Sequence, residues 1–367
     1  MILVAVPAGQ GCIPLPSQTN TLTITRPDDW HLHLRDGEAL AAVVGFSARQ
    51  FGRAVVMPNL KPPVTTVESA RRYRNCILGA LPAGSSFEPL MTLYLTDDTE
   101  PAEIDRARAS GFVCGLKYYP AGATTHSDAG VTSLARCHAA LARMEELDVV
   151  LQVHGEATGD TVDPYDREAV FVERDLAPLV KRYPRLRIVL EHVSTAVGIE
   201  FVRAQGPRVA ATLTPQHLVL NRGAMFKGGL QPHLFCLPLL KRERDREALV
   251  AAATGMDPRF FLGTDSAPHA RAAKESACGC AGVFSAHAAI EIYAHVFEVA
   301  NALGRLEAFA SHNGADYYGL PRNSGKITLR REAWTVPASY PFGAGELVPL
   351  FAGDSLSWKL IPADGRT

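Results

Sequence analysis

Eight short apolar runs recur along the chain, and most of them are separated by stretches with helical spacing. The runs lie at 29–36, 53–58, 89–95, 112–116, 148–153, 186–190, 209–213 and 260–264. Nearly continuous apolar strands that alternate with helices are typical of a parallel sheet covered by helices. Eight such units predict an α/β fold in which the sheet closes into a (β/α)8 barrel of the TIM type. The carboxyl ends of its strands then meet at one mouth, where such barrels carry their chemistry.

Side chains that can bind metal or move protons stand at five of these strand ends. They are His31, His33, Lys117, His154, His192 and Asp265. Taken singly, each has an ordinary explanation: the histidines as hydrogen-bonded core or rim groups, Lys117 as a solvated lysine, Asp265 as a helix N-cap. Their recurrence at one predicted mouth favours a shared functional site.

The pair His31 and His33 indicates the chemistry of that site. Residues two apart on a strand point to the same face, so both imidazoles face one side while Leu32 and Leu34 face the other. Neutral imidazole is a common ligand for zinc and similar metals. A bare His-x-His is weak by itself, but together with the downstream residues it predicts a metal site.

Several longer sequence segments resemble those of a known family. They are Arg26–Gly37, Met57–Asn59, Pro62–Thr66, Lys117–Ala121, Val153–Glu156, Glu191–His192, Thr214–Leu218, Gly229–His233, Gly263–His269 and Cys278–Gly282. Over roughly residues 21 to 360 the chain resembles the dihydroorotases of the amidohydrolase superfamily, in their shorter bacterial form (class II). The resemblance implies the superfamily's metal-dependent hydrolase barrel. It also implies reversible hydrolysis of the cyclic amide of (S)-dihydroorotate to N-carbamoyl-L-aspartate, in de novo pyrimidine biosynthesis.

The resemblance also implies two zinc ions per subunit, for which cobalt or manganese could substitute. The implied ligands are His31, His33 and Asp265 for one ion, His154 and His192 for the other, and Lys117 as a bridge carboxylated by CO2 to N6-carboxylysine. An ammonium has no lone pair for a cation, whereas a carbamate offers anionic oxygens and forms from the neutral amine. A hydroxide between the metals would be the nucleophile, and Asp265 the general acid and base.

On the substrate side, the resemblance implies contacts to the carboxylate and the ring of dihydroorotate. The implied residues are Arg35, Asn59 and His269 for the carboxylate, main chain near Leu237 and Ala281 for the ring edge, and His33 and His154 beside the metals. Independently of the family, a guanidinium fork two residues beyond His33 matches a carboxylate, although Arg35 and Asn59 could equally be rim hydrogen-bonding groups.

Residues 120–130 follow Lys117 and are rich in Gly and small polar side chains. Such a segment cannot bury enough apolar surface to hold one conformation unaided. The resemblance implies that Thr124 and Thr125 belong to a flexible loop that closes over bound substrate. Without the family, a plain connection between strand and helix is the simpler interpretation.

Length and composition suit one enzyme domain. We expect residues 1–20 to form a weakly ordered extension and residues 21–367 a single barrel domain, with a short addition from about residue 321. A net charge of −1 does not indicate a protein that binds nucleic acid. No apolar stretch is long enough to cross a bilayer. Seven cysteines without a secretory signal favour reduced thiols and a cytoplasmic location. The resemblance implies a homodimer that acts on a small molecule.

Two alternatives remain open at this point. A hydantoinase or allantoinase would share the two-metal core, but those relatives build a large β-sandwich from both chain ends. A catalytically silent scaffold relative would lose metal ligands, whereas all six implied ligand positions are occupied here.

Overall fold

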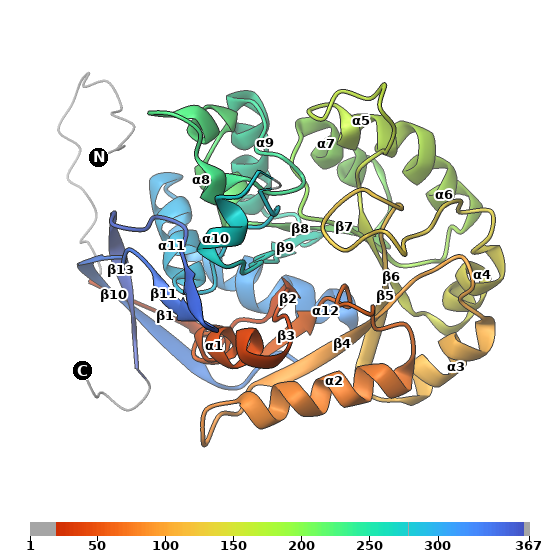
Figure 1. The fold of residues 1–367 in the computed structure, drawn as a ribbon, viewed down its shortest axis with the longest axis horizontal. Helices are drawn as coiled ribbons and strands as arrows, with labels where there is room; N and C mark the ends of the chain where they lie inside the picture. Colours follow the sequence, from red (N-terminus) through yellow and green to blue (C-terminus); the bar gives the residue numbers. More distant parts are fainter. Residues whose placement is uncertain (1–19, 278, 363–367) are drawn as a thin grey trace.

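The computed structural model describes residues 20–277 and 279–362, and its centre is a barrel of eight parallel strands (Figure 1). The strands are β2 (Asp29–Leu32), β3 (Arg53–Val56), β4 (Glu88–Tyr94), β5 (Val113–Tyr118), β6 (Val150–His154), β7 (Ile188–Glu191), β8 (Val209–Leu213) and β9 (Phe260–Leu262). They follow chain order around the barrel, and each of the eight predicted runs overlaps one of them. The predicted (β/α)8 fold is confirmed.

Helices surround the barrel (Figure 1). They are α1 (Gly37–Ala48), α2 (Val67–Ala80), α3 (Pro101–Ala109), α4 (His138–Leu147), α5 (Arg167–Phe171), α6 (Ala177–Arg182), α7 (Ala196–Ala204), α8 (Pro215–Val219), α9 (Glu243–Ala253), α10 (Arg271–Lys274), α11 (Ala289–Val299) and α12 (Asn313–Tyr318). Several begin at side-chain caps, such as Thr66, which accepts a hydrogen bond from the Ser69 N–H. Within the described ranges, no helix is long and apolar enough to cross a membrane.

Side chains alternate between two apolar clusters along the barrel strands. On β6, Leu151 and Val153 belong to the large cluster between sheet and helices, whereas Val150 belongs to a separate inner cluster. Because side chains alternate along a strand, those of Gln152 and His154 point to the same side as that of Val150, into the barrel. The Gln152 amide donates to the hydroxyl of Tyr318 at 2.8 Å. Apolar packing therefore fills the barrel near the amino ends of its strands, and polar groups gather at the carboxyl ends.

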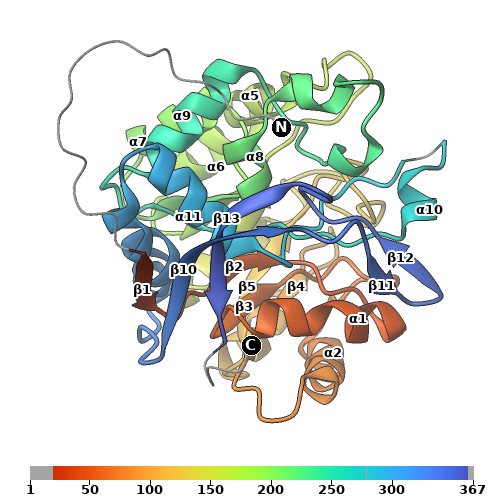
Figure 2. The ribbon, with the colours of Figure 1, turned by 90° about the vertical axis from the view of Figure 1, so that its left-hand side faces the viewer.

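Segments near both chain ends meet in a small sheet beside the barrel (Figure 2). β1 (Thr21–Thr25) pairs with β10 (Lys326–Thr335), which pairs with β13 (Ser355–Ile361), all antiparallel. The Trp358 side chain is fully buried, and its indole N–H donates to Glu298 of α11 at 3.0 Å. A hairpin of β11 (Tyr340–Phe342) and β12 (Gly345–Leu347) follows β10. Of the predicted extension at 1–20, residues 1–19 lie outside the described residues.

Candidate active site

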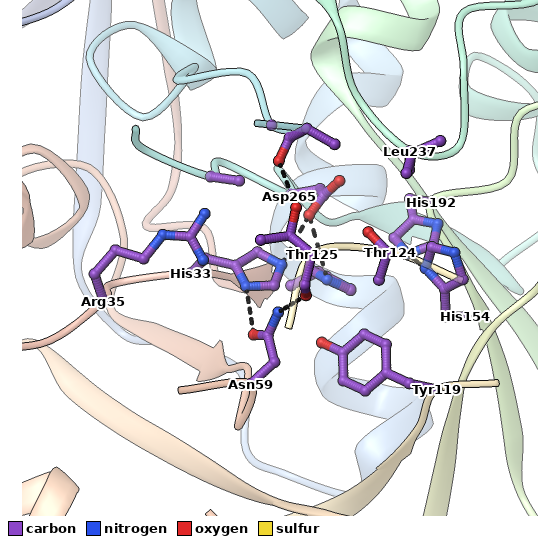
Figure 3. A pocket seen from close by; sticks show the side chains of 14 residues that line it. His33, Arg35, Asn59, Tyr119, Thr124, Thr125, His154, His192, Leu237 and Asp265 are labelled. Atoms are coloured by element: carbon purple, nitrogen blue, oxygen red, sulfur yellow. Dashed lines mark hydrogen bonds and ion pairs between the residues drawn. The ribbon is translucent and has the colours of Figure 1, made fainter. Parts of the chain in front are cut away.

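His31, His33 and Asp265 form a buried cluster at the barrel mouth, part of which is shown in Figure 3. Nε2 of His33 lies 3.0 Å and Nε2 of His31 lies 3.4 Å from the same Asp265 oxygen, Oδ1. Ligand atoms of all three residues lie within 4.8 Å of one another. Leu32 and Leu34 pack in the outer apolar cluster, so the predicted division of faces holds.

Closure of the barrel holds this cluster in place. The Asp265 N–H donates to the His31 carbonyl at 2.8 Å, and the His33 N–H donates to the Ser266 carbonyl at 3.1 Å. Asp265 and His192 both have left-handed backbone, with φ of 45° and 41°. Such conformations are uncommon outside glycine and cluster at functional sites. No helix begins within residues 265–270, so the alternative of Asp265 as a helix cap is wrong.

Three of the histidines have a side-chain oxygen within hydrogen-bond distance of one ring nitrogen. Glu191 Oε2 lies 2.7 Å from His31 Nδ1, Asn59 Oδ1 lies 2.9 Å from His33 Nδ1, and Glu156 Oε2 lies 2.8 Å from His154 Nε2. Each partner orients its ring and fixes which nitrogen carries hydrogen, as the partners of metal-binding histidines do. The opposite nitrogens of His31 and His33 face Asp265, and that of His154 lies 3.2 Å from His192 Nε2.

Lys117, His154 and His192 complete the group. The ring centroids of His31 and His192 are 5.0 Å apart, and those of His154 and His192 are 4.8 Å apart. Lys117 is fully buried on β5, with Nζ 5.1 Å from the centre of the Tyr119 ring. Among the described residues Nζ has no hydrogen-bond partner. The structure therefore brings together all six predicted ligand residues.

Burial sets the charge state of these groups. It lowers the pKa of Lys117 to about 8, against the opposing effect of Glu191 and Asp265. Burial also lowers the pKa of His31 and His192 well below the ordinary value, so both imidazoles are neutral at pH 7. Burial alone would raise the pKa of Asp265, but the hydrogen bond from His33 and electrostatic interactions with its neighbours, including Lys117, lower it to about 2. Asp265 is thus a carboxylate among neutral imidazoles.

This donor set fits divalent metal ions. Imidazole and carboxylate are ligands that zinc, cobalt and manganese accept, and they must be deprotonated to bind. Buried polar atoms are normally paired, yet Lys117 Nζ and His192 Nδ1 have no hydrogen-bond partner in the described part of the chain.

Arg35 lines the same pocket, and His269 contacts both Arg35 and the lining residue Ala281. Nη2 of Arg35 is 2.9 Å from His269 Nε2, and its Nε donates to the Pro268 carbonyl at 3.0 Å. Burial, followed by the charge of Arg35, lowers the pKa of His269 to about 2, so this imidazole is neutral. Asn59 also lines the pocket, with its amide oxygen toward His33 and its amide nitrogen donating to the Thr125 carbonyl at 3.2 Å.

Thr124, Thr125 and Leu237 line the pocket as well (Figure 3), as does Ala281, so that three different loops contribute. The Thr125 hydroxyl donates to the Ala281 carbonyl at 3.3 Å, which joins the loop after β5 to the segment after α10. The structure therefore brings the predicted substrate residues to one pocket, except that His269 contacts the lining residues Arg35 and Ala281 and does not line the pocket itself. Cys278, in the string that contains Ala281, lies outside the described residues.

Sequence reasoning missed three residues of this site, namely Tyr119, Glu156 and Glu191. The Tyr119 ring lines the pocket, and the two glutamates hold His154 and His31. Tyr119 and Glu156 stand two residues beyond Lys117 and His154, so strand alternation could have suggested both. Glu191 follows two residues after Val189 of the inner cluster, which gives the same signal.

Comparison with known proteins agrees with this geometry. The model of the amidohydrolase family matches residues 24–354. The dihydroorotase of Laribacter hongkongensis is 65% identical over 342 residues, 93% of this chain and 99% of that relative. The dihydroorotase structure from Campylobacter jejuni superposes with a TM-score of 0.86 at 36% identity, covering 94% of this chain and 99% of its own.

Two further structures separate the alternatives. The dihydroorotase of Saccharomyces cerevisiae, solved with 5-fluoroorotic acid, has a TM-score of 0.86 at 32% identity and covers 93% of this chain and 98% of its own. An L-hydantoinase from Arthrobacter aurescens has a TM-score of 0.78 at 16% identity, covering 95% of this chain and 86% of its own, a likeness of fold alone. The chain therefore belongs to the amidohydrolase family and, within it, to the dihydroorotases, which are hydrolases of cyclic amides.

Proposed function

We propose that this chain catalyses the reversible hydrolysis of (S)-dihydroorotate to N-carbamoyl-L-aspartate. One observation carries the proposal: a single pocket is lined both by the cluster of His31, His33 and Asp265 and by Arg35, which His269 contacts. A ring that bears a carboxylate beside a cyclic amide matches both groups at once, because a guanidinium fork binds carboxylate while the cluster faces the amide.

We further propose that two zinc ions occupy the site. His31, His33 and Asp265 would hold one ion, His154 and His192 the other, and Lys117, carboxylated on Nζ by CO2, would bridge them. The lowered pKa of the buried Lys117 supports this, because carbamate formation requires the neutral amine. When bound, such ions lower the pKa of a coordinated water from about 16 toward 7 and polarise the amide carbonyl.

The residues of the chain then supply proton transfer and orientation. Water adds its oxygen to the amide carbon, the ring C–N bond breaks, and the leaving nitrogen requires a proton. Asp265 is a carboxylate at neutral pH, so it can accept the proton of the attacking water and deliver it to that nitrogen. Arg35, Asn59 and His269 would hold the substrate carboxylate, and Leu237 and Ala281 the ring edge. His33 and His154 would contact substrate beside the metals.

Thr124 and Thr125 would close the pocket over substrate. Their position in its lining and the hydrogen bond from Thr125 to the Ala281 carbonyl support this role. A closed loop would exclude water and hold the ring amide in place.

A substrate panel tests the proposal. We expect kcat/KM for dihydroorotate to exceed that for hydantoin or allantoin by at least about a hundredfold, because neither carries a carboxylate to pair with Arg35. Comparable rates for hydantoin would support the alternative enzyme class instead. A silent scaffold would hydrolyse none of them. All six ligand residues are present, however, and five of them contact another member of the set, which argues against that alternative.

We also propose a homodimer in the cytoplasm. The five described cysteines carry free thiols, as is typical of a reducing compartment. The dimer follows from the family resemblance, and light scattering of the purified protein tests it.

A further inference from the structure

Lys274 is a buried lysine beside the pocket whose three donors are all engaged by main-chain carbonyls. It ends α10, and its side chain is 3% exposed. Nζ donates to the carbonyls of Phe235 at 2.7 Å, Cys280 at 2.8 Å and Gly282 at 2.7 Å. An ammonium has three N–H groups and no acceptor, so no donor remains for a substrate. Burial lowers the pKa of Lys274 to about 8, so at pH 7 the charged form with three donors prevails.

These bonds fix the direction of the Ala281 peptide groups. In a trans peptide the carbonyl and the following N–H point in opposite directions. Because the Cys280 carbonyl points to Lys274, the N–H of Ala281 points away from it. The Ala281 carbonyl, between two carbonyls that face Lys274, instead accepts from Thr125 and lies 2.9 Å from His269 Nε2. Within the described ranges, the Ala281 N–H has no acceptor.

The same ammonium joins two segments of the pocket wall. Phe235 stands two residues before Leu237, and its carbonyl also accepts from the Gly282 N–H at 2.9 Å. Leu237 and Ala281 both line the pocket, yet they belong to loops 44 residues apart in the chain (281 − 237). The buried ammonium and this main-chain hydrogen bond together hold the two loops side by side.

We infer that Lys274 is a positioning residue, which aims the free N–H of Ala281 into the pocket and holds Leu237 opposite it to receive the edge of the substrate ring. The inference deepens the proposed function and rests on it. Lys274 touches neither the metal ligands nor the reacting atoms, so its loss weakens ring binding and spares the chemical step.

The test compares Lys274→Met with Lys241→Met. Both lysines are 3% exposed, but Nζ of Lys241 has no hydrogen-bond partner among the described residues, whereas Nζ of Lys274 has three. We expect Lys274→Met to raise KM for dihydroorotate at least about tenfold, with kcat within about threefold and metal content unchanged. Calorimetric affinity for 5-fluoroorotic acid should fall by a similar factor. Lys241→Met should keep wild-type KM and affinity.

Lys274→Arg keeps a buried cation and serves if the methionine variant does not fold. A planar guanidinium cannot match three carbonyls around one point, so a loss of at least about threefold in affinity for 5-fluoroorotic acid is expected. Unchanged KM and affinity in a folded Lys274→Met, or unchanged affinity in Lys274→Arg, would overturn the inference alone. A wild-type protein that neither hydrolyses dihydroorotate nor binds 5-fluoroorotic acid would overturn the proposed function as well.

Discussion

Oδ1 of Asp265 and Nε2 of His33 lie 3.0 Å apart at the seam where the barrel closes. The seam is held by main-chain hydrogen bonds between the ends of β2 and β9, including that from the Asp265 N–H to the His31 carbonyl. A carboxylate placed in this way faces the pocket and remains charged, because the surrounding imidazoles and Lys117 outweigh the effect of burial on its pKa. The fold itself therefore sets up the group that we propose as the proton carrier.

Replacing Asp265 by Asn should abolish turnover while the fold and much of the metal remain, because an amide cannot carry the proton. Steady-state rates and metal analysis of the same sample measure both effects. Asp245→Asn is a matched control, since Asp245 is similarly buried but accepts from the Ala196 N–H away from the pocket. A turnover above about a tenth of wild type, a barrier change under ~1.4 kcal/mol, would contradict the proton-carrier role.

Lys117→Ala should lose metal and activity together, because the proposed bridge disappears with the amine. Short carboxylic acids such as acetate should restore part of both, since they supply anionic oxygens at the vacated position. Metal content and rate are measured with and without the acid, and Lys241→Ala serves as the control for removal of a buried lysine. Failure of the acid to restore either quantity would argue against a carboxylated lysine.

Replacing Arg35 by Lys keeps the charge but loses the two-pronged geometry for a carboxylate. We expect KM for dihydroorotate to rise about tenfold or more, with a smaller change in kcat, since the proposed contact binds substrate without entering the reaction. The comparison of KM with kcat is the readout. If KM stays at its wild-type value, Arg35 does not bind the substrate.

The double change Thr124→Ala and Thr125→Ala should lower kcat/KM while leaving the metals in place, because the loop loses its bond to Ala281 and its hydroxyls toward the pocket. Thr132→Ala is the control, since Thr132 contacts Asp97 outside the pocket. Wild-type kinetics in the double variant would reduce residues 120–130 to a connection between strand and helix.

The barrel could be predicted from sequence because each of its strands is buried on both faces and therefore reads as an apolar run. The pairing of β1 with β10 could not, because Thr21 and Arg330 are far apart in the chain and the strands are partly exposed. Such contacts depend on the packed barrel and α11 rather than on local pattern.

The positions of the predicted ligand residues followed from one rule, that polar residues at carboxyl ends of barrel strands converge. The same rule does not reveal which neighbours orient them. Glu156 and Glu191 look like any strand-end carboxylates until the distances to His154 and His31 are known. The role proposed for Lys274 is further from sequence reasoning, because it depends on three carbonyls from two loops that are distant in the chain.

A metal titration with a spectroscopic assay tests the central claim most directly. Protein stripped by a chelator is supplied with increasing Zn²⁺, and hydrolysis of dihydroorotate is followed in the ultraviolet together with bound metal per chain. We predict negligible activity without metal and a rise that ends near two equivalents, as expected for the six-residue donor set with Lys117 as a bridge. Full activity in the metal-free protein, or a plateau without hydrolysis at saturating zinc, would contradict this prediction.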